Sequence, residues 1–133
     1  MPPLKVKVYY HDTDSGGVVY YANYLKYLEQ ARTEFLADHG ISVKELADAG
    51  TLFVVTRQEV DYKAPAFYAD ELTVTTGVTP AGPVRFVFVH EIRNQHAVAV
   101  AAARTTMVCV DRQIRPKAIP APIIAALKEG HAL

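Results

Sequence analysis

Residues 11–40 read HDTDSGGVVYYANYLKYLEQARTEFLADHG, a turn-rich loop with two adjacent glycines followed by a long apolar-periodic run. Turn-forming residues dominate the loop, and adjacent glycines are typical of a break in regular structure. In the run, apolar side chains recur at the spacing of a helix face: Tyr24, Leu28, Ala31 and Phe35. This spacing predicts one long helix directly after the loop.

The ends of this helix also carry signals. Asn23 is a residue type that caps helix starts, and Gly40 is one that follows helix ends. A second apolar series, through Leu25, Leu28 and Leu36, makes the helix apolar around much of its circumference. We therefore expect the helix to begin after Asn23, to stop at Gly40 and to be buried on more than one side.

The remaining apolar segments have the period of strands. One strand is expected before the helix and four after it, over residues 4–10, 52–63, 71–79, 84–93 and 97–110. Ala81-Gly82-Pro83 and Asn94-Gln95-His96 are tight turns between neighbours. Short turns imply antiparallel pairing, so the sequence predicts a single α+β domain over residues 1–133. In it, a curved antiparallel sheet wraps one long helix.

Composition excludes several classes of function. Fourteen Lys and Arg balance fourteen Asp and Glu, which argues against nucleic-acid binding through overall charge. No apolar run approaches the ~20 residues of a membrane helix, and the first residues lack a signal-peptide pattern. The single cysteine fits a reducing cytoplasm, where we expect the protein to reside.

Several catalytic and metal-binding signatures are missing. Neither serine lies in a Gly-x-Ser-x-Gly motif, and Cys109 sits in a buried strand pattern. The histidines have no zinc-site spacing. Asp12 to Asn23 resembles a calcium loop, but Gly16 and Asn23 occupy positions that need ligands. We expect no bound metal.

Two carboxylates remain, Asp12 and Asp14, shortly before the helix. Turn chemistry explains them adequately, because aspartate favours turns and helix starts. A carboxylate can also act as a nucleophile or general base. Near Tyr21, the helix start offers unpaired N–H groups that can hold an oxyanion. Spacing alone leaves both interpretations open.

Six of the eight tyrosines fall within residues 9–27. Packing at a boundary between sheet, helix and a neighbouring subunit explains this cluster well, because tyrosine is apolar with one polar end. An aromatic pocket for an acyl group is the functional alternative.

Three blocks of the chain resemble one known family. HDTDSGGVVYYANYLKYLEQARTEFL, the block from Val60 to Leu72, and the segment from Val110 to Pro120 together resemble the 4-hydroxybenzoyl-CoA thioesterase family of hotdog-fold proteins. The similarity is greatest to the Tol-Pal-associated (YbgC-like) acyl-CoA thioesterase branch. It implies a hotdog fold and hydrolysis of an acyl-CoA thioester, which is a substrate and not a cofactor.

The resemblance also implies an assembly and two site residues. Family members form homodimers or homotetramers with active sites between subunits. The catalytic carboxylate of the family corresponds to Asp14, as nucleophile or general base, and its backbone N–H oxyanion donor falls on Tyr21.

Further residues follow from the same resemblance. We assign the acyl pocket to Gly17, Val19 and Tyr24, and contacts with coenzyme A phosphates to Arg115 and Lys117. Acyl carrier protein is an alternative carrier of the acyl group.

One departure keeps alternatives open. Many members of the Tol-Pal branch have His where this chain has Tyr21, whereas the hydroxybenzoyl-type enzyme has Tyr. An aromatic acyl-CoA thioesterase is therefore a second hypothesis. A non-catalytic acyl-thioester binder, or a scaffold for acyl carrier protein, is a third.

Overall fold

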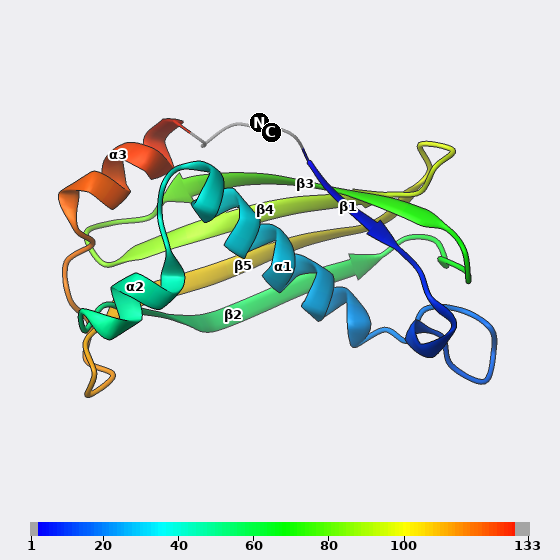
Figure 1. The fold of residues 1–133 in the computed structure, drawn as a ribbon, viewed down its shortest axis with the longest axis horizontal. Coiled ribbons are helices and arrows are strands. Elements are labelled where there is room, and N and C mark those ends of the chain that lie inside the picture. Colours follow the sequence, from blue (N-terminus) through cyan, green and yellow to red (C-terminus); the bar gives the residue numbers. More distant parts are fainter. Residues whose placement is uncertain (1–2, 130–133) are drawn as a thin grey trace.

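The computed structural model describes residues 3–129 of the chain (Figure 1). Five strands and three α-helices make up the fold, with a short 3-10 helix in the loop after the first strand. In chain order they are β1 (Leu4–Lys7), η1 (Tyr10–Asp12), α1 (Asn23–Asp38), α2 (Val43–Asp48), β2 (Leu52–Tyr62), β3 (Glu71–Pro80), β4 (Arg85–Arg93), β5 (Ala99–Val110) and α3 (Ala121–Glu129). None of these helices has the length and apolar character needed to cross a bilayer.

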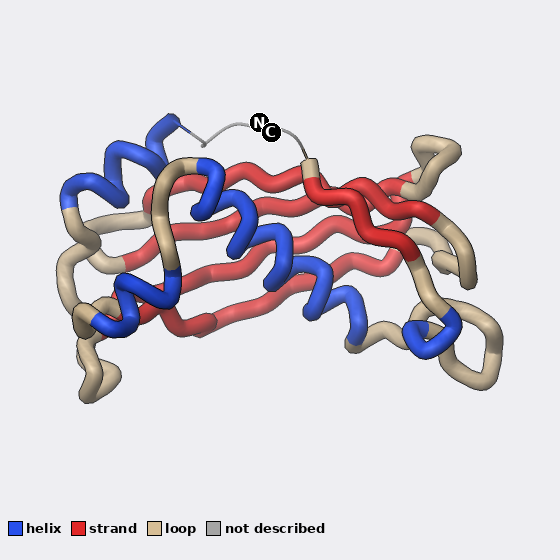
Figure 2. Tube along the Cα trace, in the orientation of Figure 1, coloured by secondary structure: helices blue, strands red, loops and turns tan. Residues whose placement is uncertain are grey.

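The strands form one sheet in the order β1-β3-β4-β5-β2, and every neighbouring pair is antiparallel. α1 lies across one face of this sheet (Figure 2). The predicted α+β class with an antiparallel sheet and one long helix is confirmed. The strands after the helix do not simply follow one another, however, because β2 pairs with β5 and not with β3. β2 is thereby left as one edge of the sheet.

α1 buries a single face, and the prediction of burial on more than one side was wrong for the chain as described. Leu25, in the second apolar series, is 42% exposed, and the face opposite the sheet carries exposed charged side chains such as Lys26 and Glu34. The helix is amphipathic in the ordinary sense. Its buried residues are Tyr24, Tyr27, Leu28, Ala31, Phe35 and Leu36.

The two ends of α1 differ from each other. Asn23 is the first helical residue and not the cap, because Ala22 occupies the N-cap position without a side-chain hydrogen bond. The Asn23 amide instead donates to the carbonyl of Asp12, at 2.8 Å. Gly40 ends the helix as predicted. Its φ is +76°, and the Ile41 N–H returns to the carbonyl of Leu36, as in a Schellman motif.

Strand positions agree with the sequence patterns, and most strand ends lie within one residue of those expected, whereas two ends lie further away. β1 stops at Lys7, where residues 4–10 were expected, because η1 begins at Tyr10. β5 begins at Ala99, since Ala97 adopts a φ of +61° within the turn that follows β4. Both predicted tight turns are present.

The core between α1 and the sheet has two apolar parts separated by polar side chains. One cluster lies around Leu28 and Leu72, and the other around Phe86 and Phe88. Polar residues occupy the strand positions between them: Thr76 on β3, His90 on β4 and Thr105 on β5. We call this set, together with Arg32 of α1 and Gln58 of β2, the polar belt.

Hydrogen bonds connect the members of the polar belt. Thr105 donates to the Gln58 side chain at 2.8 Å and accepts from Arg32 at 3.4 Å. Thr76 pairs with Nδ1 of His90 at 3.1 Å, while His90 Nε2 is buried with no partner among the described residues. Burial, with the charge of Arg32 adding to it, lowers the pKa of His90 to about 3. His90 is therefore neutral at pH 7.

This neutral, buried histidine predicts a loss of stability in mild acid. The unfolded chain takes up a proton at His90 below pH ~6.5, whereas the folded chain does not until about pH 3. Stability therefore falls as the pH decreases between those values, by up to ~1.4 kcal/mol per pH unit from this group. In His90→Gln, we expect the loss between pH 7 and 4.5 to be smaller by about 2 kcal/mol.

Urea unfolding at a series of pH values measures this effect. His96→Gln is the matched control, because His96 is exposed in the turn between β4 and β5. An identical pH dependence in the His90→Gln variant and the wild type would contradict the prediction.

Candidate active site

The loop that carries Asp14 is held at both of its ends. The Asp14 N–H donates to the carbonyl of Val18 at 2.9 Å, and Thr13 and Val19 form an isolated antiparallel bridge. The Val19 N–H donates to the carbonyl of Ala66 at 2.8 Å, which fastens the loop to the segment between β2 and β3. The reversal within the loop uses Gly17, whose φ of +80° is unfavourable for other residues.

The Asp14 carboxylate is exposed and only partly engaged. One oxygen, Oδ1, accepts the N–H of Gly16 at 2.8 Å. Among residues 3–129, no second group donates to this carboxylate. The other oxygen therefore faces solvent and remains available to a reactant.

Directly after the loop, the chain turns into α1. The Tyr20 N–H donates to the carbonyl of Asp12 at 2.9 Å, and the Asn23 N–H donates to the carbonyl of Tyr20 at 2.8 Å. Between these two, the Tyr21 N–H donates to no acceptor within the described part of the chain. Tyr21 immediately precedes the N-cap residue Ala22, so its N–H lies near the positive end of the helix dipole. Tyr21 thus offers a donor suited to a developing negative charge.

A cavity of about 300 Å³ opens beside this helix start. It is bordered by the end of the loop, the first turn of α1 and the end of β2. The Tyr62 hydroxyl donates to the carbonyl of Tyr21 at 3.2 Å, and the Tyr62 ring lies 5.5 Å from that of Tyr24. Burial raises the pKa of both Tyr24 and Tyr62, so both are neutral phenols at pH 7. The residues that line the cavity are Val18, Val19, Tyr21, Tyr24, Tyr62, Lys63, Ala64 and Pro65.

This lining agrees in part with the pocket assigned from sequence. Val19 and Tyr24 line the cavity, but Gly17 lies outside it and serves the turn of the loop. Sequence reasoning missed the second wall, from Tyr62 to Pro65. The block beginning at Val60 contains that wall, and its resemblance to the family is the one signal in the sequence that points to it. Lys63 gives this lining its one cationic side chain.

Arg115 and Lys117 lie far from Asp14 within one chain. Their loop follows β5 and sits at the Leu52 end of β2, whereas the Asp14 loop sits at the Tyr62 end (Figure 1). Lys117 donates from Nζ to the Thr51 hydroxyl at 2.9 Å, and Arg115 is exposed. A single chain does not bring these cations to the cavity.

The turn that presents Arg115 is well ordered by hydrogen bonds. The Asp111 carboxylate accepts the N–H groups of Arg115 at 3.0 Å and of Gln113 at 2.9 Å. The bond from Arg115 is the main cause that lowers the pKa of Asp111. Asp111 therefore stays ionised and fixes this turn at neutral pH.

The chain matches known proteins over nearly its whole length. Residues 8–127 fit the model of the thioesterase-like superfamily. The chain belongs to this superfamily. It is 40% identical over 125 residues to the acyl-CoA thioester hydrolase YbgC of Escherichia coli, covering 93% of each chain.

Two further relatives agree with this family. The 1,4-dihydroxy-2-naphthoyl-CoA hydrolase of Thermosynechococcus vestitus is 30% identical, with 92% of this chain and 86% of that protein covered. The crystal structure of a 1,4-dihydroxy-2-naphthoyl-CoA thioesterase from Synechocystis superimposes with a TM-score of 0.91 at 27% identity, covering 96% of each chain. The fold, recognised from sequence as the hotdog fold, is confirmed, and this member of the superfamily is a thioester hydrolase.

The contact between Gly16 and Asp14 predicts a sensitive position. A Cβ atom at Gly16 would lie 3.2 Å from Asp14 Oδ1, closer than side chains normally tolerate, so the carboxylate must shift. We expect Gly16→Ala to lower kcat for thioester hydrolysis by about tenfold, because small displacements of reacting groups are costly. Gly16 does not have a positive φ, so little stability should be lost.

Steady-state kinetics and thermal unfolding separate these effects. Gly82→Ala is the control, because its φ of +112° makes a side chain strained while no atom lies near its added Cβ. It should lower the melting temperature and leave kcat unchanged. A Gly16→Ala enzyme of wild-type rate would show that the position of the Asp14 carboxylate is not critical.

Proposed function

We propose that the protein hydrolyses an acyl-CoA thioester to the free acid and coenzyme A, with Asp14 as the reacting carboxylate and the Tyr21 N–H as oxyanion donor. The observation that carries this proposal is the free Tyr21 N–H at the start of α1, joined by one short loop to an exposed, half-engaged carboxylate. The family and the names of its relatives support the substrate class.

Two routes use the same groups. In the first, an oxygen of Asp14 attacks the thioester carbonyl, the Tyr21 N–H stabilises the oxyanion, and coenzyme A leaves as a thiolate. Water then cleaves the resulting anhydride and restores the carboxylate. In the second, Asp14 takes a proton from water as that water attacks the carbonyl. Both routes release one carboxylic acid and one thiol for each water consumed.

An aromatic acyl group is the second candidate for the substrate. The rings of Tyr21, Tyr24 and Tyr62 border the cavity, and aromatic pairs gain energy beyond the area that they bury. The relatives named for 1,4-dihydroxy-2-naphthoyl-CoA fit such a pocket. A ratio of kcat/KM that favours benzoyl over short aliphatic thioesters would distinguish this candidate.

The edge strand β2 supports a homodimer. Its eleven residues pair with β5 on one side only, and Val55 on it is 47% exposed. A long unpaired edge with apolar side chains favours pairing with another chain. Antiparallel pairing of β2 with its copy places the Leu52 end of one chain beside the Tyr62 end of the other. Arg115 and Lys117 of each subunit would then approach the cavity of its partner, where they would bind coenzyme A phosphates.

The role of Asp14 is tested by Asp14→Asn. The amide neither attacks the carbonyl nor accepts a proton, so we expect kcat to fall by ~100-fold or more. Thiol release is measured with acetyl-, butyryl-, hexanoyl-, palmitoyl-, benzoyl- and hydroxybenzoyl-CoA. Asp38→Asn is the matched control, because Asp38 is an exposed carboxylate at the far end of α1.

The same assay tests both the role of Asp14 and the proposed acyl-CoA substrate. Near-normal turnover by Asp14→Asn would remove Asp14 from the mechanism. A folded wild-type protein without turnover on any of these thioesters would refute the proposed hydrolysis of acyl-CoA and favour a carrier-protein substrate or a binding scaffold.

The proposed subunit pairing is tested at Val55. A lysine at this edge position introduces charge between the two copies of β2, so we expect Val55→Lys to be monomeric by light scattering. Its KM for acyl-CoA should rise, because the partner's cations are lost. Arg115→Ala should raise KM while the protein remains dimeric, and Arg104→Ala, an exposed control on β5, should change neither quantity. A dimeric Val55→Lys protein would argue against pairing through β2.

A further inference from the structure

Asp12 accepts hydrogen bonds through both its backbone carbonyl and its carboxylate. Its carbonyl accepts two hydrogen bonds, one from the Tyr20 N–H just before α1, at 2.9 Å, and one from the side-chain amide of Asn23, the first residue of α1, at 2.8 Å. Its carboxylate accepts the N–H of Tyr9 at 2.9 Å through Oδ2. The backbone carbonyl of Asp12 therefore joins this loop to the start of α1, and the Asp12 carboxylate holds that carbonyl in place by closing the short turn from Tyr9.

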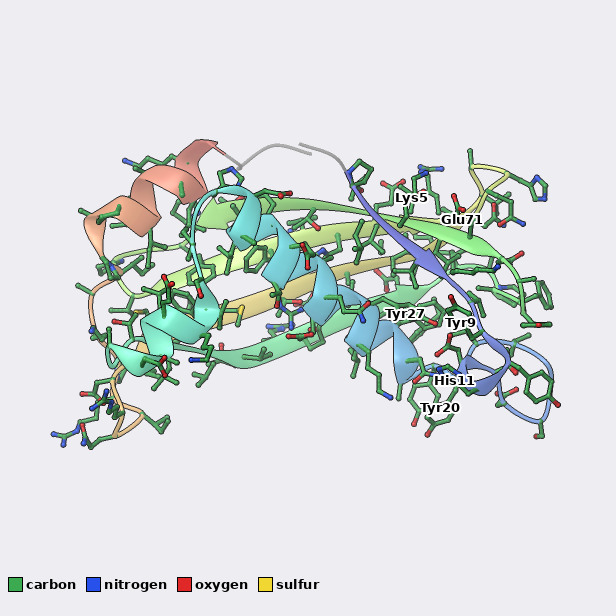
Figure 3. The ribbon with its side chains drawn as sticks, in the orientation of Figure 1. Lys5, Tyr9, His11, Tyr20, Tyr27 and Glu71 are labelled. Atoms are coloured by element: carbon green, nitrogen blue, oxygen red, sulfur yellow. The ribbon has the colours of Figure 1, made fainter. Side chains whose placement is uncertain are left out.

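A buried hydroxyl also lies close enough to this carboxylate to sense its charge. Tyr27, on the inner face of α1, is 5% exposed, and its hydroxyl has no partner at hydrogen-bonding geometry among the described residues. Burial is the main cause that raises the pKa of Tyr27, and the negative charge of Asp12 raises it further. Figure 3 shows Tyr27 together with Tyr9, His11 and Tyr20 in the region where the chain leaves β1 and α1 begins.

We propose that Asp12 is a positioning residue: its carboxylate fixes the turn from Tyr9, this turn orients the Asp12 carbonyl, and the carbonyl locks the loop of Asp14 to the start of α1 and so fixes the Asp14 carboxylate relative to the Tyr21 N–H. This proposal rests on the function proposed above. Tyr20 and Asn23, which both donate to the Asp12 carbonyl, lie on either side of Tyr21 in the sequence. Their two bonds therefore limit the direction in which the Tyr21 N–H points. The bond between Asp12 and Tyr20 also closes the base of the loop that carries Asp14.

Asp12 itself is poorly placed to react. Its side chain is 15% exposed, one oxygen is used by Tyr9, and the other lies 3.6 Å from Nε2 of His11. Asp14, by contrast, is exposed and lies beyond the closed base of the loop. Because a misplacement of about 1 Å can cost ~100-fold in rate, a residue that only holds the loop can still have a large effect on kcat.

The test compares three variants in the full-length protein. Asp12→Ala removes the carboxylate, Asp12→Asn keeps an oxygen acceptor for the Tyr9 N–H, and Asn23→Ala removes only the amide bond to the Asp12 carbonyl. Hydrogen exchange of a peptide covering residues 13–22 reports on the loop without any need for activity. Tyr10→Phe is the control, because Tyr10 is 77% exposed in the same region.

For Asp12→Ala, we expect exchange in residues 13–22 to be at least tenfold faster, while β3, β4 and β5 stay protected. We expect kcat to fall by ten- to 100-fold with KM changed less than threefold, and Asp12→Asn to recover most of both losses. Asn23→Ala should show the same pattern more weakly. If Asp12→Ala does not fold, Asn23→Ala replaces it as the test of the proposal.

Several results would overturn the proposal. Unchanged exchange in residues 13–22 would show that Asp12 does not hold the loop. Faster exchange with unchanged kcat would show that the ordering of residues 13–22 by Asp12 does not affect the rate of hydrolysis. Loss of protection throughout the sheet would indicate a general structural role. If wild type hydrolyses no thioester, the proposed function fails, and the exchange measurement still decides whether Asp12 orders the loop.

Discussion

The packing of α1 on the sheet determines where the site can form. Leu28 is completely buried on the inner face of the helix, and burying such a side chain contributes roughly 1.5–3 kcal/mol. This packing fixes the direction of the helix, so that its N-terminal N–H groups point out at the end of the sheet where β2 finishes. The Asp14 loop then needs only a short connection to reach them. Helix position, cavity and free Tyr21 N–H therefore share one cause.

The polar belt imposes a second constraint on the same packing. An apolar core tolerates a helix that slides along it, because apolar contacts have little directionality. The bonds from Arg32 to Thr105 and from Thr105 to Gln58 link α1, β5 and β2 at defined positions. Polar groups this deep are costly unless they are paired. The belt therefore favours one alignment of α1 along the sheet, and this alignment also sets the distance from Tyr21 to the end of β2.

The sequence predicted the features that depend on local periodicity. The helix up to Gly40, the strands and both tight turns follow from spacing and turn residues, and the resemblance supplied the hotdog fold. The partners of polar side chains were out of reach, because they depend on tertiary contacts. Asn23 has the chemistry of a cap, but the Asp12 carbonyl lies within its reach and it bonds there instead. The wall from Tyr62 to Pro65 was missed for the same reason, since only the folded sheet brings it beside Tyr24.

The separation between Asp14 and Arg115 follows from the geometry of β2. An eleven-residue strand extends about 35 Å at ~3.3 Å per residue. Side chains at its two ends are therefore too far apart to line the same small pocket. A coenzyme A molecule that used both groups of one chain would have to span the whole edge of the sheet. A two-fold axis across β2 would remove this problem, because it would place the Leu52 end of one strand beside the Tyr62 end of its copy. Under this pairing, the cations and the carboxylate that contact one substrate would come from different subunits. Each site would then require both chains.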